Sequence, residues 1–118
     1  MKPYYLTSSL PYTNAYPHIG FALEIIQADV LARWHRQKGE DVFFLTGTDE
    51  HGSKIAKAAA DAGVSPQEFT DKIASRFQEL TKVLTISNDD FIRTSDQERH
   101  WPSVRVVWNS LYKNGDME

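Results

Sequence analysis

The first third of the chain alternates between strand-like and helix-like apolar patterns, which constrains the fold more than any other feature. Residues 4–10 are rich in aromatic, β-branched and small side chains and predict a strand, followed by a loop from Pro11 to Pro17. Apolar side chains recur at helical spacing over 18–38, with Pro17 suited to the first turn and Gly39 to the residue past the end. Residues 42–46 are continuously apolar, as in a strand covered on both faces. The pattern predicts a βαβ unit with parallel strands and a right-handed crossover.

The rest of the chain adds helices and one short strand. A helix is expected over 53–62, ended by Gly63, and another from the capping box at 65–68 to Leu84. Residues 91–94 predict a third strand. Ser95 and Glu98 form a second capping-box pattern, which predicts a helix from Ser95 to Asn114, with Pro102 near its start or at a kink. The order predicts an α/β fold on a parallel sheet whose edges and faces need further cover.

Composition excludes several classes of protein. The chain has 118 residues, enough for one small domain, and its net charge of -3 argues against holding nucleic acid by bulk positive charge. No apolar stretch approaches the roughly 18 to 20 residues of a membrane span, and the N-terminus lacks the apolar run of a secretory signal. With no cysteine, disulfide scaffolds, cysteine-based zinc sites and thiol nucleophiles are excluded. We therefore expect a cytoplasmic protein that does not associate with a membrane.

The first candidate site is the loop and helix start at residues 11–21. Unpaired N–H groups and the positive end of the helix dipole favour phosphate at such a position. His18 adds a side-chain donor, Gly20 allows close approach to the backbone, and Asn14 can donate or accept. The alternative is a proline-bounded turn with a surface histidine, since neither a GxGxxG nor a Walker pattern is present.

The second candidate site is the loop at residues 47–52, which follows the apolar strand. A phosphate-binding P-loop is excluded because Asp49 and Glu50 would repel phosphate and the lysine is misplaced. A metal site is weakly supported, because adjacent side chains point apart. A carboxylate at a strand end can instead pair with a cation, such as the ammonium group of an amino acid. The alternative is that Asp49 caps the following helix.

Two further groups of side chains have mainly structural interpretations. The basic end of the first helix most often represents a solvated face, and less often an RNA-binding patch; it comprises Arg33, His35, Arg36 and Lys38. The three tryptophans lie near apolar stripes and are expected in the core rather than as base-stacking platforms; they are Trp34, Trp101 and Trp108.

Both loops resemble a known family. The stretch PYTNAYPHIGF (residues 11–21) resembles the HIGH signature region of class I aminoacyl-tRNA synthetases. The stretches QADV (27–30), ARWHR (32–36) and FLTGTDEHG (44–52) narrow the resemblance to the methionyl-tRNA synthetases, and it extends from Tyr4 to Glu118. It implies the first half of a Rossmann-like doubly wound sheet.

The resemblance also implies a reaction and a set of site residues. Methionine and ATP, accompanied by Mg²⁺, would condense to methionyl-adenylate, and the aminoacyl group would pass to tRNA. The residues that would contact methionine are Ser9, Leu10, Tyr12 and Asp49, with Asp49 holding the ammonium group. The residues that would contact ATP are Tyr12, Asn14, His18, Gly20 and Phe21, of which His18, Gly20 and Phe21 would be catalytic. No zinc is expected to be bound by this chain.

Two features depart from that family pattern. The fourth signature position is Phe21 rather than histidine, and the chain ends near the point where the family inserts a connective domain. The KMSKS loop and the anticodon-binding part are absent. We therefore expect residues 1–118 to form the N-terminal half of the catalytic nucleotide-binding domain, incomplete as an enzyme by itself. The alternatives are a stand-alone α/β module that binds a nucleotide or small molecule, and an interaction protein without a ligand.

Overall fold

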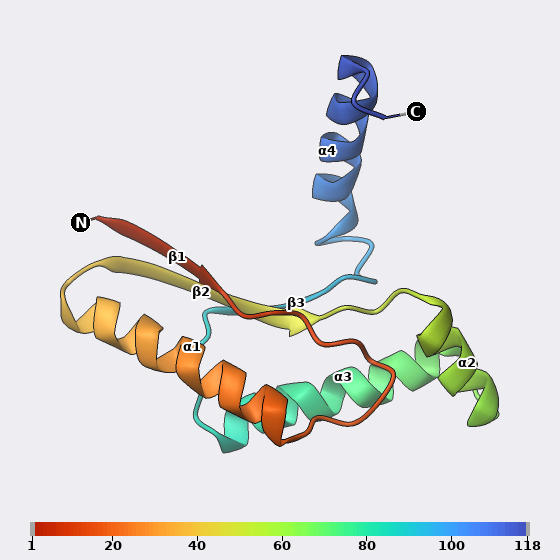
Figure 1. Cartoon of the computed structure of the whole chain (residues 1–118), viewed down its shortest axis with the longest axis horizontal. Coiled ribbons are helices and arrows are strands. Elements are labelled where there is room, and N and C mark those ends of the chain that lie inside the picture. Colours follow the sequence, from red (N-terminus) through yellow and green to blue (C-terminus); the bar gives the residue numbers. More distant parts are fainter. Residues whose placement is uncertain (1, 118) are drawn as a thin grey trace.

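The computed structural model of the chain describes residues 2–117. Three strands and four helices follow one another along the sequence (Figure 1). In order, they are β1 (Pro3–Thr7), α1 (Ile19–Gln37), β2 (Asp41–Thr48), α2 (Ser53–Asp61), α3 (Pro66–Val83), β3 (Asp90–Arg93) and α4 (Trp101–Asn114). The predicted α/β class is confirmed.

The three strands form one parallel sheet in the order β1-β2-β3. Tyr4 lies opposite Val42, and Thr46 lies opposite Phe91. Parallel pairing of β1 and β2 across α1 confirms the predicted parallel βαβ unit. The carboxyl ends of β1 and β2 consequently lie at the same edge of the sheet, where the two candidate loops begin.

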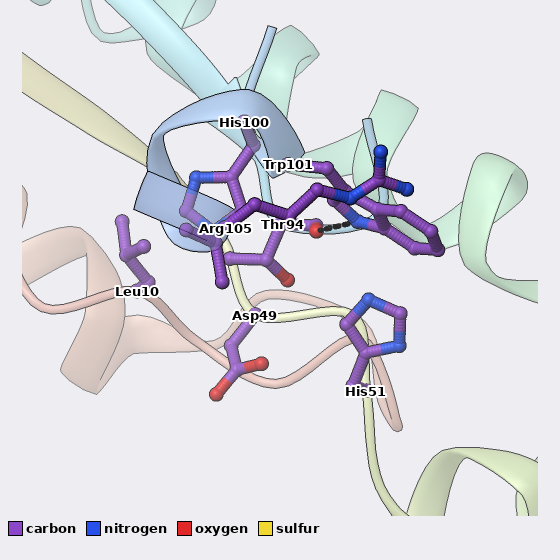
Figure 2. A pocket seen from close by; sticks show the side chains of 8 residues that line it. Leu10, Asp49, His51, Thr94, His100, Trp101 and Arg105 are labelled. Carbon is purple, nitrogen blue, oxygen red and sulfur yellow. Dashed lines mark hydrogen bonds between the residues drawn. The ribbon is translucent and has the colours of Figure 1, made fainter. Parts of the chain in front are cut away.

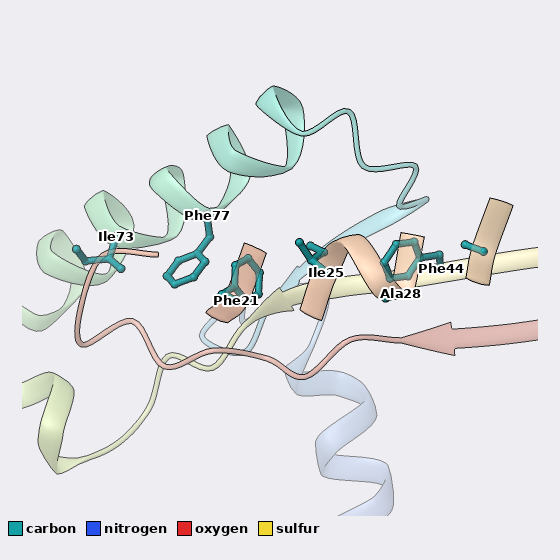
Figure 3. Packing of buried hydrophobic residues seen from close by; sticks show 7 residues of the cluster. Phe21, Ile25, Ala28, Phe44, Ile73 and Phe77 are labelled. Carbon is teal, nitrogen blue, oxygen red and sulfur yellow. The ribbon is translucent and has the colours of Figure 1, made fainter. Parts of the chain in front are cut away.

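The hydrophobic core lies between the sheet and the helices α1 and α3, which both cover the same face (Figures 1 and 3). Phe44 of β2 is fully buried there, packed with a cluster that both helices supply: Phe21, Ile25, Ala28, Ala32, Ile73 and Phe77. On the opposite face, Tyr5 and Phe43 stack at 5.9 Å between ring centroids, with Tyr5 63% exposed. The prediction that residues 42–46 are covered on both faces is therefore wrong for this chain, because α1 and α3 cover one face only.

Local capping signals set most of the helix boundaries. The capping box of α3 is confirmed: the Ser65 hydroxyl accepts the Glu68 N–H at 3.2 Å, and the Glu68 carboxylate accepts the Ser65 N–H at 3.1 Å. Gly39 has φ 77, as predicted for the residue beyond the end of α1. At the start of α1 the prediction is wrong by a residue or two, since His18 is the N-cap and Pro17 precedes the helix.

The helix α4 begins later than its capping-box pattern predicts. Ser95 does not cap a helix, because its hydroxyl donates to the Glu50 carboxylate. Instead, the Asp96 carboxylate accepts the N–H groups of Glu98 and Arg99 at 2.9 Å each, forming a separate turn. The helix starts at Trp101, so Pro102 falls in its first turn and causes no kink.

The tryptophans and the apolar stripe of α4 do not enter the core. Trp34 and Trp108 are 52% and 57% exposed, and α4 contributes no buried residue. Trp101 is partly buried, and its indole N–H donates to the Thr94 carbonyl at 3.1 Å. The expectation of core tryptophans is therefore wrong. Trp34 lies on an uncovered side of α1, and α4, which carries Trp101 and Trp108, projects away from the sheet (Figure 1). No helix within residues 2–117 is long and apolar enough to cross a membrane.

Candidate functional site

The two candidate loops meet at the carboxyl ends of β1 and β2. Tyr12 and Asp49 form a parallel bridge. The Thr13 N–H donates to the Asp49 carbonyl at 3.1 Å, and the Asp49 N–H donates to the Pro11 carbonyl at 2.9 Å. The backbone of Asp49 is therefore extended, and neighbouring side chains point to opposite sides of it.

A cavity of about 570 Å³ lies between these loops and the first turns of α4 (Figure 2). We call it the α4 cavity. Its walls bring together two of the predicted site residues, Leu10 and Asp49, from different loops. The remaining lining residues are His51, Thr94, His100, Trp101, Val104 and Arg105. The cavity thus combines apolar walls with a carboxylate, as an amino acid with an apolar side chain requires.

Asp49 does not cap the helix that follows it. The N-cap of α2 is Gly52, which has φ 139 and makes no side-chain cap hydrogen bond. The Asp49 side chain lines the α4 cavity instead. The capping alternative is therefore wrong.

Glu50 turns the other way and is fully buried, with its side chain 0% exposed. Its Oε1 accepts from the Thr48 hydroxyl at 2.6 Å and from the Arg93 Nε at 2.7 Å, while Oε2 accepts from the Ser95 hydroxyl. Arg93 also donates to Asp71 of α3 at 2.6 Å. Burial alone would lower the pKa of Arg93, but its hydrogen bonds to the two carboxylates hold that pKa above its ordinary value.

His18 and Gly20 act together at the start of α1. The His18 Nδ1 accepts the Gly20 N–H at 3.0 Å, so the neutral ring carries its proton on Nε2 and presents a donor there. A Cβ on Gly20 would lie 2.8 Å from the His18 Cε1. Glycine therefore makes room for the imidazole cap, a role that spacing alone did not indicate.

The other predicted residues lie in separate surroundings. Ser9 is bound to Glu24 of α1, through its N–H at 2.7 Å and its hydroxyl at 2.8 Å. Tyr12 lines a second cavity of about 190 Å³ beside the start of α2. Asn14 lines a third, of about 360 Å³, against α2 and α3. The structure thus joins Leu10 to Asp49, with Tyr12 adjacent, and keeps Asn14 apart from them.

The basic end of α1 is occupied by intramolecular contacts. Arg33 pairs with Asp29 at 2.7 Å, and Arg36 pairs with Asp89 at 2.7 Å. Lys38 lies 3.2 Å from the Glu40 carboxylate, which also bonds the His35 ring. These cations tie α1 to the segments after α1 and α3, which favours the structural interpretation over a nucleic-acid patch. Within residues 2–117 no group of three or more His, Asp or Glu residues could hold a metal ion.

Comparison with known proteins identifies the family. Residues 4–118 match the family model described as "tRNA synthetases class I (M)". The chain belongs to this family. The methionine–tRNA ligases of Brucella melitensis and Thermotoga maritima are 47% and 50% identical to it over 98% and 97% of the chain. The chain covers 22% and 18% of their lengths, about a fifth.

A solved structure of this synthetase family matches the fold closely. It is the Mycobacterium tuberculosis methionyl-tRNA synthetase in complex with methionyl-adenylate, 45% identical, with a TM-score of 0.94. The match covers 98% of this chain and 22% of that one. The likeness therefore extends over all the elements described above.

Phe21, the fourth residue of the signature stretch, is a core residue in this chain. Its ring is 5% exposed and packs edge to face on Phe77, in the core rather than toward the surface of the loop (Figure 3). A buried phenyl ring can neither reach a nucleotide nor donate a hydrogen bond to it. The expectation that Phe21 is a catalytic or ATP-binding residue is therefore wrong, and Phe21 is a packing residue.

Reasoning from the sequence also missed the far wall of the α4 cavity. His100 and Arg105 enter it because α4 starts at Trp101, and no local pattern relates them to Asp49. Glu50 and Arg93 were missed because their partnership spans 43 residues. The only sequence signal for this ion pair was its position: an arginine at the end of the third strand and a carboxylate at the end of the second.

Proposed function

We propose that the chain forms the N-terminal half of the catalytic domain of a methionine–tRNA ligase. The ligase would activate methionine with ATP and transfer the aminoacyl group from methionyl-adenylate to tRNA, in the cytoplasm. The observation that carries this proposal is the likeness over 98% of the chain to a synthetase holding methionyl-adenylate. The juxtaposition of Leu10 and Asp49 in one cavity supports it independently.

On this proposal, the α4 cavity contributes to the methionine subsite. The Asp49 carboxylate pairs with the substrate ammonium group, and Leu10 contacts the thioether side chain. Tyr12 fixes Asp49 through the backbone bridge, and Ser9 anchors the end of β1 to α1 through Glu24. Holding the ammonium group orients the methionine carboxylate for attack, which is how positioning lowers a barrier.

The start of α1 would receive the nucleotide. In the reaction, the methionine carboxylate attacks the α-phosphate of ATP, and pyrophosphate leaves with the electrons of the broken bond. The His18 Nε2–H and the N–H groups of the first turn can neutralise charge on the phosphates, and Asn14 of the preceding loop would add a side-chain contact to ATP. Mg²⁺ would accompany ATP as part of the substrate.

The experiment is methionine-dependent exchange of pyrophosphate into ATP. We expect exchange by the complete protein that carries this chain, and little or none by residues 1–118 alone, because catalytic groups that act together are not additive. Exchange that depends on another amino acid would contradict the substrate. Nucleotide binding without any amino-acid dependence would favour the stand-alone binding module.

A further inference from the structure

The carboxylate of Glu50 is buried and does not line the α4 cavity. Both of its oxygens are engaged by Thr48, Arg93 and Ser95, and its side chain is 0% exposed. Its backbone N–H also donates, to the Thr94 hydroxyl at 2.8 Å. Glu50 is therefore not a ligand for a substrate, despite lying next to Asp49.

Stability alone is a weak reason for such an arrangement. Buried ion pairs lose much of their Coulomb attraction to desolvation, and apolar replacements of similar volume often serve equally well. The Glu50–Arg93 pair instead fixes the direction in which successive side chains of this segment point. Thr48 and Glu50 both face inward, so Asp49 between them must face outward, along the extended backbone.

The consequence is seen at the α4 cavity, which is lined by Asp49 and His51, the residues on either side of Glu50 in the sequence. Two partners of Glu50, Arg93 and Ser95, lie on β3 and on the segment leading to α4, the same segment whose Thr94 contributes to the cavity wall. Glu50 thus ties the two walls of the cavity together at the point where Asp49 enters it.

We propose that Glu50 is a positioning residue, which holds Asp49 and the 94–95 segment in register so that the amino-acid subsite is formed before the ligand arrives. The identity of the ligand, methionine, rests on the proposed function, whereas the contacts of Glu50 do not depend on it. Preorganisation of this kind matters because displacing a binding group by about 1 Å can cost up to about 100-fold.

The test compares Glu50→Gln with Asp71→Asn in the complete protein. Each variant removes the charge of one carboxylate partner of Arg93. Asp71→Asn leaves the bonds of Glu50 to Thr48, Arg93 and Ser95 intact. L-methionine affinity is measured by calorimetry, and stability by urea unfolding. Amide hydrogen exchange is followed at Asp49 and Thr13, whose N–H groups form the bridge between the loops.

We expect Glu50→Gln to weaken methionine binding by about tenfold or more and to speed exchange at both amides. Asp71→Asn, at a half-exposed carboxylate, should lose less stability and should keep methionine affinity within about twofold and the slow exchange. Equal losses of affinity in both variants, or unchanged affinity and exchange in Glu50→Gln, would overturn the proposal.

Two further outcomes are distinguishable. If the unsubstituted protein does not bind methionine, the proposed function fails, and the exchange rates alone decide whether Glu50 holds the loop. If Glu50→Gln does not fold, Ser95→Ala removes a single bond to Glu50 and leaves the ion pair. It should then weaken methionine binding by about threefold, and no change in affinity or exchange there would refute the positioning role.

Discussion

The rings of Phe21 and Phe77 meet edge to face in the core, with centroids 4.9 Å apart and planes at 90°. We therefore predict that Phe21→His lowers the free energy of unfolding by about 2 to 4 kcal/mol, since it loses apolar volume and buries a polar ring. It should not accelerate adenylate formation. Urea unfolding and pyrophosphate exchange measure the two effects. Phe21→Leu is the matched control and should cost about 1 kcal/mol; a rate gain in Phe21→His would show that the position faces the phosphates.

The imidazole cap of α1 allows its structural and chemical roles to be separated. His18→Ala should lose about 1 kcal/mol of stability, because the Gly20 N–H loses its acceptor. His18→Asn should retain stability, since asparagine is a good N-cap, but it lacks the ring Nε2–H. We expect both variants to form adenylate more slowly. Full activity in His18→Asn would mean that the histidine serves only as a cap.

Capping motifs predicted the helix starts correctly where the hydrogen-bond partners lie within the same turn. Ser65 and Glu68 complete a capping box because both partners lie within one turn. Ser95 and Glu98 have the same spacing, yet Ser95 donates to Glu50, 45 residues earlier, so tertiary contact overrides the motif. The rule that ligands bind at the carboxyl ends of parallel strands led to Asp49, because the rule places a residue at an edge of the sheet. It could not interpret Glu50, because it does not identify which residue of a neighbouring strand is the partner.

Exposed apolar residues also limited the prediction from sequence. The apolar side chains that carry the helical pattern of α1, Leu23, Ile26 and Trp34 among them, are exposed, whereas the side of the helix that enters the core carries Ile25 and Ala28. Periodicity detects apolar faces without indicating which of them this chain itself covers. The helix is apolar on more than one side, and only the sheet decides which side forms the core.

Thr13 carries the buried hydroxyl that finds no hydrogen-bond partner among the described residues. We expect Thr13→Val to raise the free energy of unfolding by about 1 kcal/mol, because an unpaired polar atom is replaced by a methyl group of similar shape. Thr46→Val is the matched control, since the buried Thr46 hydroxyl bonds Ser8 at 2.7 Å, and it should lower stability by a similar amount. Thermal unfolding distinguishes the two, and a loss in both variants would mean that Thr13 has a polar partner.

Asp29 makes the stability of the fold depend on acid pH. Burial alone would raise the pKa of its carboxyl, but hydrogen bonds from Ser87 and Arg33 hold that pKa below its ordinary value. A depressed folded-state pKa stabilises the fold above the unfolded pKa of about 3.9, and this contribution is lost as pH falls toward the folded pKa. We expect urea unfolding to show stability falling below about pH 5. Asp29→Asn should be less stable at pH 7 and show a shallower fall, and an unchanged slope would contradict this assignment.

Asp49 is the residue on which the amino-acid subsite depends most directly. Asp49→Asn keeps the shape of the side chain but removes its charge, so we expect methionine binding by the complete protein to weaken by roughly 2 to 5 kcal/mol. Because Gly52 rather than Asp49 caps α2, stability should change by less than about 0.5 kcal/mol. The matched control is Asp61→Asn, an exposed carboxylate at the end of the same helix, which should leave methionine affinity unchanged. Calorimetry and urea unfolding on both variants separate the possibilities. A lower free energy of unfolding with unchanged methionine affinity in Asp49→Asn would show that Asp49 has a structural role. The ammonium group of methionine would then have no assigned partner in this chain.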